Sequence, residues 1–216
     1  MSPKLKLKSH QFSGKLIVFE GTDGAGKTTM ISMTERYIKD RIGEDNVCSI
    51  KQPTDLSRKT KLFQKMMYSS NHSDIDYRAV QLLTMSDRVQ HAFEVIAPAL
   101  KEGKTVICDR YIYTSLANML ARGYLKERWF YSAARHILKP DMVFLAYVSP
   151  EMAIGRIKNR PDECERYLDE NLLHNVSEQF IKMAKREKFV VLDTSGNVES
   201  AFSVVKQHLQ ERGNYE

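Results

Sequence analysis

The sequence predicts an α/β fold in which a doubly wound, five-stranded parallel sheet is flanked by helices. Five short and nearly continuous apolar runs recur along the chain, as expected for strands that are buried on both faces of a parallel sheet. Patterns with helical spacing fill the intervals between these runs. The length of 216 residues suits one domain with a single hydrophobic core.

The apolar runs are rich in Val, Ile, Leu and Phe. The strands predicted from them are Leu16 to Phe19, Val47 to Ile50, Thr105 to Cys108, Met142 to Val148 and Phe189 to Leu192. The predicted helices are Thr28 to Arg41, Asp76 to Lys101, Pro150 to Arg160 and Val198 to Arg212. Because ligands bind beyond the carboxyl ends of the strands in such sheets, functional residues are expected directly after each strand.

The clearest helical pattern runs from Asp76 to Lys101. Apolar residues recur there at helical spacing and predict a stripe that faces the core. The stripe consists of Leu82, Met85, Val89, Ile96 and Leu100.

The first fourteen residues form a basic segment, which we expect to be a flexible tail ahead of a single domain at 15–216. This segment carries Lys4, Lys6 and Lys8 but has no apolar core of the kind that a secretory signal requires. No apolar stretch in the sequence approaches the roughly 20 residues that a membrane helix needs. We therefore expect no contact with a membrane.

The cysteines indicate the redox compartment of the protein, and the net charge bears on its binding partners. Cys48, Cys108 and Cys164 match no zinc or redox spacing, which favours a reducing, cytoplasmic setting. The net charge of +6 would suit a nucleic-acid partner, but no basic stripe with interleaved aromatic residues appears. Basic side chains gathered around nucleotide phosphates explain the excess equally well, so we expect no nucleic acid.

The segment from Gly21 to Thr28 reads G-T-D-G-A-G-K-T and fits the phosphate-loop pattern G-x-x-x-x-G-K-[ST]. Glycines let the backbone curl so that successive N–H groups point at phosphate oxygens. Lys27 then supplies charge to the β- and γ-phosphates, and the hydroxyl of Thr28 can ligate magnesium. We expect ATP and Mg²⁺ to bind here, with contacts from Gly21, Asp23, Gly24, Ala25, Gly26, Lys27, Thr28 and Thr29.

Asp23 is unusual in a phosphate loop, because a carboxylate repels phosphates. We expect its side chain to point away from them. Two alternatives remain, a sugar hydroxyl of a second substrate and bulk solvent.

Several further motifs, spanning about Lys15 to Leu209, together resemble thymidylate kinases. Phe19 to Thr29 resembles that family's phosphate loop closely, and Asp109-Arg110-Tyr111 resembles its Asp-Arg-Tyr motif. The other matching segments are Asp87-Arg88 with Gln90 (monophosphate-site helix), Pro140-Asp141 and Ser149-Pro150-Glu151 (approach to the lid), Arg160, Glu165, Arg166 and Tyr167 (lid), and Asp193-Thr194-Ser195 (adenine loop). The resemblance implies a P-loop kinase that transfers the γ-phosphoryl of ATP to a pyrimidine nucleoside monophosphate, most directly dTMP. It also implies a homodimer.

These motifs have physical interpretations of their own. Asp109 follows a buried strand beside the loop, where its carboxylate can hold magnesium directly or through water. Arg110 can grip a phosphate with its planar fork, or it forms only a local ion pair at the strand end. Arg88 lies off the apolar stripe, so it is either a solvated charge or, as the resemblance implies, a contact to the acceptor nucleotide. The resemblance implies further acceptor contacts from Asp23, Pro53, Arg110, Tyr111 and Tyr167.

A basic stretch near 156–170 is expected to act as a lid. Arg156, Lys158, Arg160 and Arg166 crowd around Pro161-Asp162-Glu163, and a flexible basic flap can close over the transferring phosphoryl group. A solvated helix face is the alternative. In the family a catalytic arginine comes from the phosphate loop or from the lid. Since the loop position is Gly24 here, Arg160 and Arg166 are the candidates, and the resemblance also implies donor contacts from Arg156 and Ser195.

The chain departs from the family around the acceptor. Thymidylate kinases usually carry a Phe that stacks on thymine where this chain has Thr84, and a Tyr or Phe against the deoxyribose where it has Asn118. Tyr113 or Tyr124 could compensate. Lys51-Gln52-Pro53 stands where bacterial members typically read Arg-Glu-Pro. The sequence therefore supports kinase chemistry more firmly than thymidine specificity, and another pyrimidine monophosphate remains an alternative acceptor.

Three other classes of function remain as alternatives. A deoxynucleoside kinase needs a carboxylate base for its neutral hydroxyl acceptor; its relatives place that base as Glu-Pro, where this chain has Gln52, although Asp109 could serve. A GTPase would carry a guanine-reading Asn-Lys-x-Asp, which the sequence lacks. A non-catalytic nucleotide-binding module would be expected to lose Lys27, Asp109 or the lid arginines, all of which are present.

Overall fold

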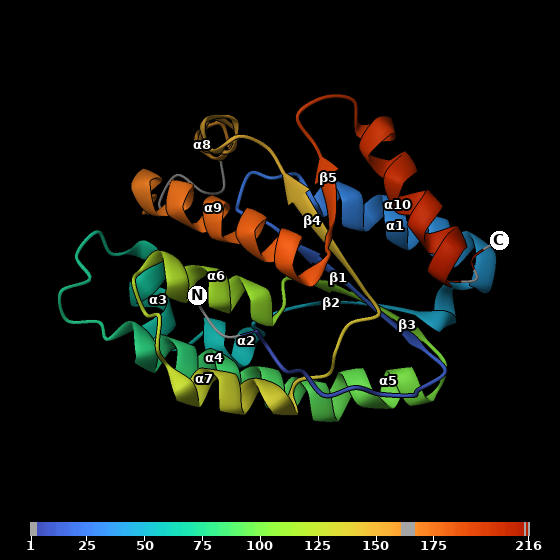
Figure 1. The fold of residues 1–216 in the computed structure, drawn as a ribbon, viewed down its shortest axis with the longest axis horizontal. Coiled ribbons are helices and arrows are strands. Elements are labelled where there is room, and N and C mark those ends of the chain that lie inside the picture. Colours follow the sequence, from blue (N-terminus) through green and yellow to red (C-terminus); the bar gives the residue numbers. More distant parts are fainter. Residues whose placement is uncertain (1–3, 161–166, 214, 216) are drawn as a thin grey trace.

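The computed structural model describes residues 4–160, 167–213 and 215. Its five parallel strands form one sheet in the order β2-β3-β1-β4-β5, which confirms the predicted doubly wound fold. The strands are β1 (Lys15–Glu20), β2 (Val47–Lys51), β3 (Thr105–Asp109), β4 (Met142–Tyr147) and β5 (Val190–Asp193). Because β1 pairs with both β3 and β4, its carboxyl end lies at the middle of the sheet edge (Figure 1).

Helices cover both faces of this sheet (Figure 1). The α-helices are α1 (Lys27–Ile42), α2 (Asp55–Arg58), α3 (Lys61–Tyr68), α4 (Tyr77–His91), α5 (Ala97–Lys101), α6 (Ile112–Ala121), α7 (Arg128–Ala133), α8 (Pro150–Lys158), α9 (Glu170–Glu187) and α10 (Val198–Gly213). Three short segments complete the order: η1 (Glu44–Asn46), the π-helical η2 (Ala92–Ile96) and η3 (Ala134–His136).

Alternate residues of β1 enter two different cores, as the pleat of a strand requires. Leu16 and Val18 pack with residues of α4, α5, α6 and α9, whereas Ile17 and Phe19 pack with residues of α1 and α10. All four side chains are fully buried. Because both faces of the strand are buried at these four positions, Leu16 to Phe19 reads as a continuous apolar run, and the polar Glu20 follows at its end.

The predicted helix from Asp76 to Lys101 is present as α4, η2 and α5 in direct succession, with Asp76 as the N-cap. Its predicted apolar stripe is partly wrong. Met85, Ile96 and Leu100 are buried, but Leu82 and Val89 are 55% and 36% exposed. The buried face of α4 instead carries polar residues, among them Thr84, Asp87 and Arg88, because it borders a cavity and the start of α2.

The basic amino-terminal segment is packed against the domain along its described residues, contrary to the expected flexible tail. Leu5 is buried in the core on the α6 and α9 side of the sheet. The backbone of Lys8 bridges to the chain before β4: its N–H donates to Ile137 and its C=O accepts from Lys139, both at 2.8 Å. Alternating Lys and Leu residues place lysines in solvent and leucines against the domain.

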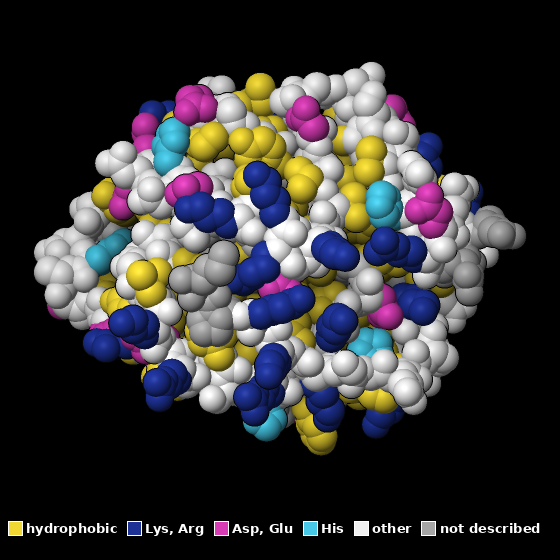
Figure 2. All heavy atoms as spheres, viewed as in Figure 1, with side chains coloured by type: hydrophobic (Ala, Val, Ile, Leu, Met, Phe, Trp, Pro, Cys, Tyr) yellow, Lys and Arg dark blue, Asp and Glu magenta, His cyan; other side chains and the backbone are white. Residues whose placement is uncertain are grey.

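The surface is strongly basic, in keeping with the net charge of +6. Lys and Arg side chains are spread over the face that Figure 2 shows, with fewer acidic side chains among them. Within residues 4–160 and 167–213, no helix is both long and apolar enough to cross a membrane.

Replacing Leu5 by Ala should lower the free energy of unfolding by about 2–3 kcal/mol, because a buried leucine leaves a cavity when it is truncated. Urea denaturation of the two proteins measures this difference. Lys6→Ala is the matched control, since Lys6 is exposed, and it should stay within about 0.5 kcal/mol of the unmodified protein. Equal unfolding midpoints for Leu5→Ala and the unmodified protein would show that the segment is not docked in solution.

Candidate active site

The phosphate loop joins the end of β1 to the start of α1, where the fold places it beside the ends of β3 and β4. Gly21, Gly24 and Gly26 all have positive φ values, of 140°, 76° and 80°. A Cβ atom on Gly24 would lie 2.4 Å from the backbone oxygen of Ala153 in α8. The loop therefore needs glycine at this position both for its conformation and for its close contact with α8.

Lys27 is buried inside the curl of this loop. Its Nζ donates hydrogen bonds to the backbone oxygens of Gly21 at 3.1 Å and Thr22 at 2.7 Å. Burial and, to a smaller extent, the nearby charge of Arg110 lower the pKa of Lys27 to about 7, against the opposing effect of Asp23 and Asp109. An anionic phosphate beside the ammonium would favour the charged form, so the site is suited to a phosphate ligand.

Arg110 and Asp23 form an ion pair across the start of the loop. The guanidinium of Arg110 also donates to the backbone oxygen of Gly21 at 3.0 Å. Asp23 thus points toward Arg110, and the two side chains line a cavity together. A sugar-hydroxyl contact for Asp23 stays a prediction.

Glu20, the last residue of β1, is a buried carboxylate that sequence reasoning missed. Its Oε1 accepts hydrogen bonds from the backbone N–H groups of Tyr111 at 2.9 Å and Thr114 at 3.1 Å, and its Oε2 accepts from the Thr114 hydroxyl. Burial raises the pKa of Glu20 to about 7, although Thr114, Arg110 and Arg88 all favour the ionised form. Glu20, at the end of β1, thus caps the first turn of α6, a helix that follows β3 in the chain. The sequence shows only that Glu20 stands between an apolar strand and Gly21 of the phosphate loop. Nothing in that pattern indicates that its carboxylate binds the start of α6.

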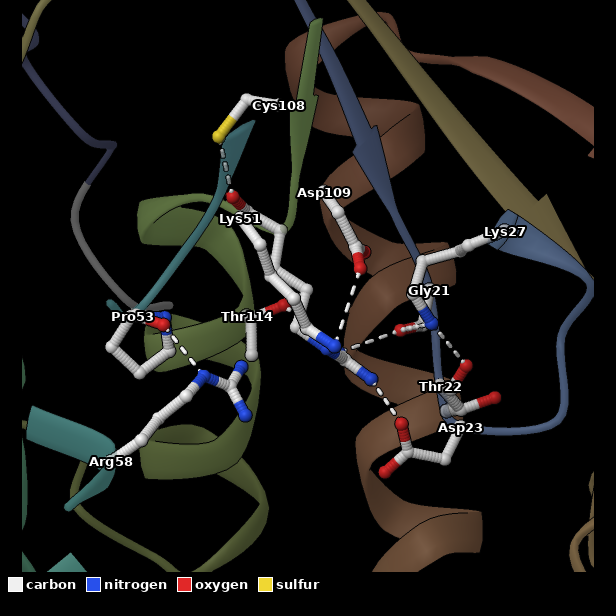
Figure 3. Close-up of polar contacts among 11 residues, drawn as sticks. Gly21, Thr22, Asp23, Lys27, Lys51, Pro53, Arg58, Cys108, Asp109 and Thr114 are labelled. Carbon is white, nitrogen blue, oxygen red and sulfur yellow. Dashed lines mark hydrogen bonds and ion pairs between the residues drawn. The ribbon is translucent and has the colours of Figure 1, made fainter. Parts of the chain in front are cut away.

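Asp109 lies at the end of β3, close to Lys51 at the end of the neighbouring strand β2 (Figure 3). Its Oδ2 is 3.8 Å from the Nζ of Lys51 at the end of β2. Its Oδ1 is buried and has no hydrogen-bond partner in the described part of the chain. An unsatisfied carboxylate oxygen at the edge of the phosphate loop fits the predicted magnesium ligand, as does the exposed Thr28 at the start of α1.

A cavity of about 390 Å³ lies on the side of the loop where Asp23 points, and we call it the α4–α6 cavity. Its volume falls in the usual range for a small-molecule site, roughly 300–1,000 Å³. Polar lining residues include Thr22, Asp23, Lys51, Arg58, Arg88, Arg110 and Thr114, and apolar ones include Phe63, Met66, Met67, Tyr77, Val80 and Phe180. Of these, Thr22, Arg58, Thr114 and the apolar residues of α3 and α4 were not predicted.

Arg88 is almost fully buried, which excludes a solvated helix charge. Its guanidinium donates to the backbone oxygens of Thr84 at 3.1 Å and Tyr111 at 3.3 Å, and burial lowers its pKa. Arg88 and Thr84 both line the α4–α6 cavity. Pro53, which follows a cis peptide bond after Gln52, lines it as well.

Two tyrosines lie elsewhere than the sequence suggested. Tyr111 was predicted to contact the substrate, but it is fully buried and its hydroxyl donates to the backbone oxygen of Leu138 at 2.9 Å. Tyr113 was a candidate to replace a missing aromatic ring, but it packs edge-on against Phe189 in the core. Tyr111 is the N-cap of α6 and Tyr113 lies in its first turn; neither lines the cavity, whereas Thr114 and Asn118 do.

Aromatic and polar side chains of several segments surround the part of the cavity beyond Thr84. Tyr77 is buried there, 6.1 Å from the ring of Tyr124. Asn118 and Tyr167 also line the cavity, and the Tyr167 ring lies edge-on to His72 at 5.8 Å. The presence of these residues around one cavity is consistent with a substrate pocket, and their individual roles stay predictions.

A second cavity of about 400 Å³ lies on the opposite side of the loop, and we call it the α8–α10 cavity. It is lined by Gly24, Gly26, Thr29, Met30, Arg156, Asn159, Arg160, Thr194, Gly196 and Val198. Arg156 donates to the backbone oxygens of Gly24 at 3.3 Å and Thr194 at 2.9 Å, which ties α8 to the loop and to β5. Ser195 lies between two of the lining residues, and its N–H donates to Asp193 at 2.9 Å.

The predicted lid is only partly covered by the structure. Arg160 borders the α8–α10 cavity, next to the phosphate loop. Arg166, with residues 161–166 as a whole, lies outside the described residues. The catalytic roles predicted for Arg160 and Arg166 remain predictions.

Known proteins with similar sequences point to one family. The family model "Thymidylate kinase" matches residues 19–205. A probable thymidylate kinase of Pyrococcus horikoshii is 37% identical over 175 residues, which are 80% of this chain and 83% of the relative. A thymidylate kinase of Ligilactobacillus salivarius is 31% identical over 197 residues, which are 86% of this chain and 92% of the relative.

The fold agrees with these sequence matches. A crystal structure of thymidylate kinase from Ehrlichia chaffeensis superposes with a TM-score of 0.66 over 91% of this chain and 98% of the other, at 22% identity. At that identity the superposition supports the fold alone, whereas the family model and the sequence relatives cover most of the chain. The chain therefore belongs to the thymidylate kinase family, whose members are ATP-dependent nucleoside monophosphate kinases.

Proposed function

We propose that this protein transfers the γ-phosphoryl group of ATP to a pyrimidine nucleoside monophosphate, most directly dTMP to give dTDP. One observation carries this proposal: successive residues of a single phosphate loop line two separate cavities. Thr22 and Asp23 border the α4–α6 cavity, while Gly24 and Gly26 border the α8–α10 cavity. A kinase that transfers a phosphoryl group from one nucleotide to another must bind the phosphates of both next to each other, and this arrangement allows it.

ATP is assigned to the α8–α10 cavity, together with the loop. The left-handed glycines turn backbone N–H groups toward bound phosphates, and Lys27 lies within the same curl. Thr28 and Asp109 would hold Mg²⁺, since Asp109 offers a buried oxygen without a partner among the described residues. Such an ion neutralises charge on the phosphates during the transfer.

The monophosphate is assigned to the α4–α6 cavity, where cationic side chains gather at the loop end. Arg110, held by Asp23 and the backbone of Gly21, is placed to grip the acceptor phosphate with its fork. The acceptor oxygen is already anionic near neutral pH, so no strong general base is needed. Positioning and charge neutralisation then account for the catalysis.

The structure gives less support to a deoxynucleoside kinase. Gln52, at the position where that class carries its base, is fully buried, and its Nε2 lies 3.2 Å from Nδ1 of His91. Asp109, the other candidate base, is not among the described residues that line the α4–α6 cavity. A reducing cytoplasmic setting is part of the proposal, and it agrees with the free thiols of Cys48 and Cys108.

We infer further that Glu20 positions Arg110 for the transfer. Arg110 has a φ of 65°, which is uncommon for a side chain with a Cβ atom, and the segment that follows it is bonded to Glu20. Thr114 joins the two, since its hydroxyl donates to Glu20 and accepts from Arg110 at 3.3 Å. Glu20 thus acts on the acceptor phosphate only through Arg110.

Changing Lys27 to Met should leave the fold intact and lower kcat about a hundredfold or more, because the charge developing on the transferring group loses a stabilising partner. The assay follows label from γ-labelled ATP into nucleoside diphosphates, with nucleosides and monophosphates as acceptors. Lys39→Met is a matched control: Lys39 is a partly exposed lysine of α1 that pairs with Glu35 and lines neither cavity, so this variant should keep full activity. Near-normal transfer by folded Lys27→Met, or labelling of nucleosides only, would overturn the proposed function.

Changing Glu20 to Gln should lower kcat on the order of tenfold to a hundredfold while leaving the KM for ATP nearly unchanged, because small misplacements of a positioning group are costly. The same change should raise the thermal stability of the protein near and above neutral pH. With its pKa raised to about 7, Glu20 stabilises the fold when protonated, fully so below 4.5, and this contribution is lost as pH rises through about 7.

Melting temperatures at several pH values test the stability prediction. Glu20→Gln should melt higher than the unmodified protein above pH 7 or so, and this advantage should shrink as pH falls toward 4.5. A variant that is less stable at every pH, with kcat unchanged, would show that Glu20 only supports the fold.

We also propose that two copies associate through an exposed apolar stripe on α4 and η2. Leu82, Val89 and Phe93 are 55%, 36% and 77% exposed, and their spacing of seven and four residues puts them on one side of the continuous helix. Such a stripe, unusual on a monomer, suits a self-complementary twofold contact.

Phe93→Asp should convert a dimer into a monomer, because the contact would bury an unpaired carboxylate. Sedimentation equilibrium at micromolar concentration measures the mass. Met152→Asp, a partly exposed residue of α8, is the control and should remain dimeric. A monomeric unmodified protein, or a dimeric Phe93→Asp, contradicts the proposal.

A further inference from the structure

Residues 51–58, from the end of β2 through α2, form one wall of the α4–α6 cavity, and we call them the 51–58 segment. Its lining residues are Lys51, Pro53 and Arg58. Arg58 is fixed within the segment, because its Nε donates to the backbone oxygen of Pro53 at 2.6 Å (Figure 3). Asp87 of α4 fastens the later part of the segment, since its Oδ2 accepts from the N–H groups of Thr54 at 2.8 Å and Ser57 at 3.2 Å. This wall of the cavity therefore takes its position from α4.

Gln52 and His91 form a second link between the 51–58 segment and α4, one helical turn beyond the first. Gln52 is fully buried, and its Nε2 lies 3.2 Å from Nδ1 of His91. The backbone N–H of Gln52 donates to the C=O of Asp109 at 2.9 Å, which joins it to the end of β3. Because Gln52 stands between Lys51 and Pro53, a fixed Gln52 side chain also fixes the backbone of these two lining residues.

The contact between Gln52 and His91 requires a neutral imidazole ring. An amide nitrogen only donates, so Nδ1 of His91 is the acceptor and the ring proton is on Nε2. The protonated ring would carry a donor at Nδ1 as well, and Gln52 would have to turn its amide or move. The Oε1 of Gln52 has no partner among residues 4–160, 167–213 and 215, so within them the contact to His91 is the one side-chain hydrogen bond that holds Gln52.

The surroundings of His91 favour this neutral form near pH 7. Burial lowers the pKa of His91 from its usual 6.5, although the charges of Asp87 on α4 and Glu94 on η2 act in the opposite direction. The charged side chains in and beside the 51–58 segment make their contacts elsewhere: Lys51 with Asp109, Arg58 with the backbone of Pro53, and Asp55 with Lys59. His91 therefore gains its proton only as the pH falls below 6.5.

We propose that Gln52 and His91 are positioning residues for the acceptor, which hold this wall of the monophosphate site in place only while His91 is neutral. The inference rests on the proposed function, because it takes the α4–α6 cavity as the monophosphate site. Protonation of His91 releases Gln52, the wall loosens, and the monophosphate binds less tightly. The pair does not act on the donor side, since no residue of the 51–58 segment is among the described residues that line the α8–α10 cavity.

The test measures the Kd of dTMP by calorimetry between about pH 8 and about pH 5, in the unmodified protein and in variants of the pair. His91→Asn is the reference, because its side-chain oxygen can replace Nδ1 as the acceptor and does not titrate. Each Kd is divided by that of His91→Asn at the same pH. This ratio cancels the titration of the ligand's own phosphate, whose second pKa is about 6, and that of groups which both proteins share.

For the unmodified protein, the ratio should be near one at the upper end of this pH range and rise about threefold to tenfold toward the lower end. His91→Leu, which removes the acceptor, should bind dTMP about threefold to tenfold more weakly than His91→Asn at every pH. Gln52→Glu should show no rise in acid, because a carboxylate accepts from the protonated ring. His136→Asn is the matched control, since His136 is exposed on η3 and lines neither cavity, and it should follow the unmodified protein.

Proton NMR of the His91 ring, assigned by its loss in His91→Asn, reports the titration directly. The pKa of His91 should lie below 6.5 in the unmodified protein and above it in Gln52→Glu. The inference is overturned if dTMP binds but the ratio for the unmodified protein stays constant with pH, or if His91→Leu binds dTMP as well as His91→Asn does. Absence of binding by dTMP, dUMP and dCMP at every pH would instead overturn the proposed function, and the inference with it.

Discussion

The buried carboxylate of Glu20 is the interaction on which the geometry of the site depends. It ends the central strand, where the phosphate loop begins, and it accepts three hydrogen bonds from the first turn of α6. Removing a carboxylate from water is costly, and the raised pKa of Glu20 records that cost. The hydrogen bonds and the nearby arginines offset part of it. The fold thereby fixes α6 and Arg110 relative to the phosphate loop.

This arrangement separates two tasks along the same loop. On one side, the proposed donor site would consist of the glycines, Lys27 and Arg156, that is, of backbone and buried side chains that leave little freedom for variation. On the other side, α4 and α6 present replaceable side chains to a cavity. Thr84 and Asn118, where the family usually has aromatic rings, lie on these two walls. Differences in acceptor preference would therefore arise in the α4–α6 cavity without disturbing the phosphate chemistry.

Much of the sheet and of the phosphate site could be predicted, because strands buried on both faces and glycine-rich loops have strong local patterns. Helix α6 was missed because Ile112–Ala121 is mostly apolar and largely buried, so it lacks the periodicity of a surface helix. The docking of Leu5 and the burial of Arg88 depend on partners far away in the sequence. The role of Glu20 was missed for the same reason, because its hydrogen-bond partners Tyr111 and Thr114 lie far away in the sequence. Leu82 and Val89 were predicted to be buried but are exposed, because an apolar pattern with helical spacing does not determine which face of the helix meets the core.

The central claim is that one phosphate loop serves two nucleotide sites at once. Calorimetry with adenosine and thymidine joined through five phosphates tests it most directly, because this compound can fill both sites together. The account predicts that it binds more tightly than either ATP or dTMP and that each of them, added in excess, displaces it. Displacement by ATP alone, or an affinity no greater than that of ATP, would contradict the claim.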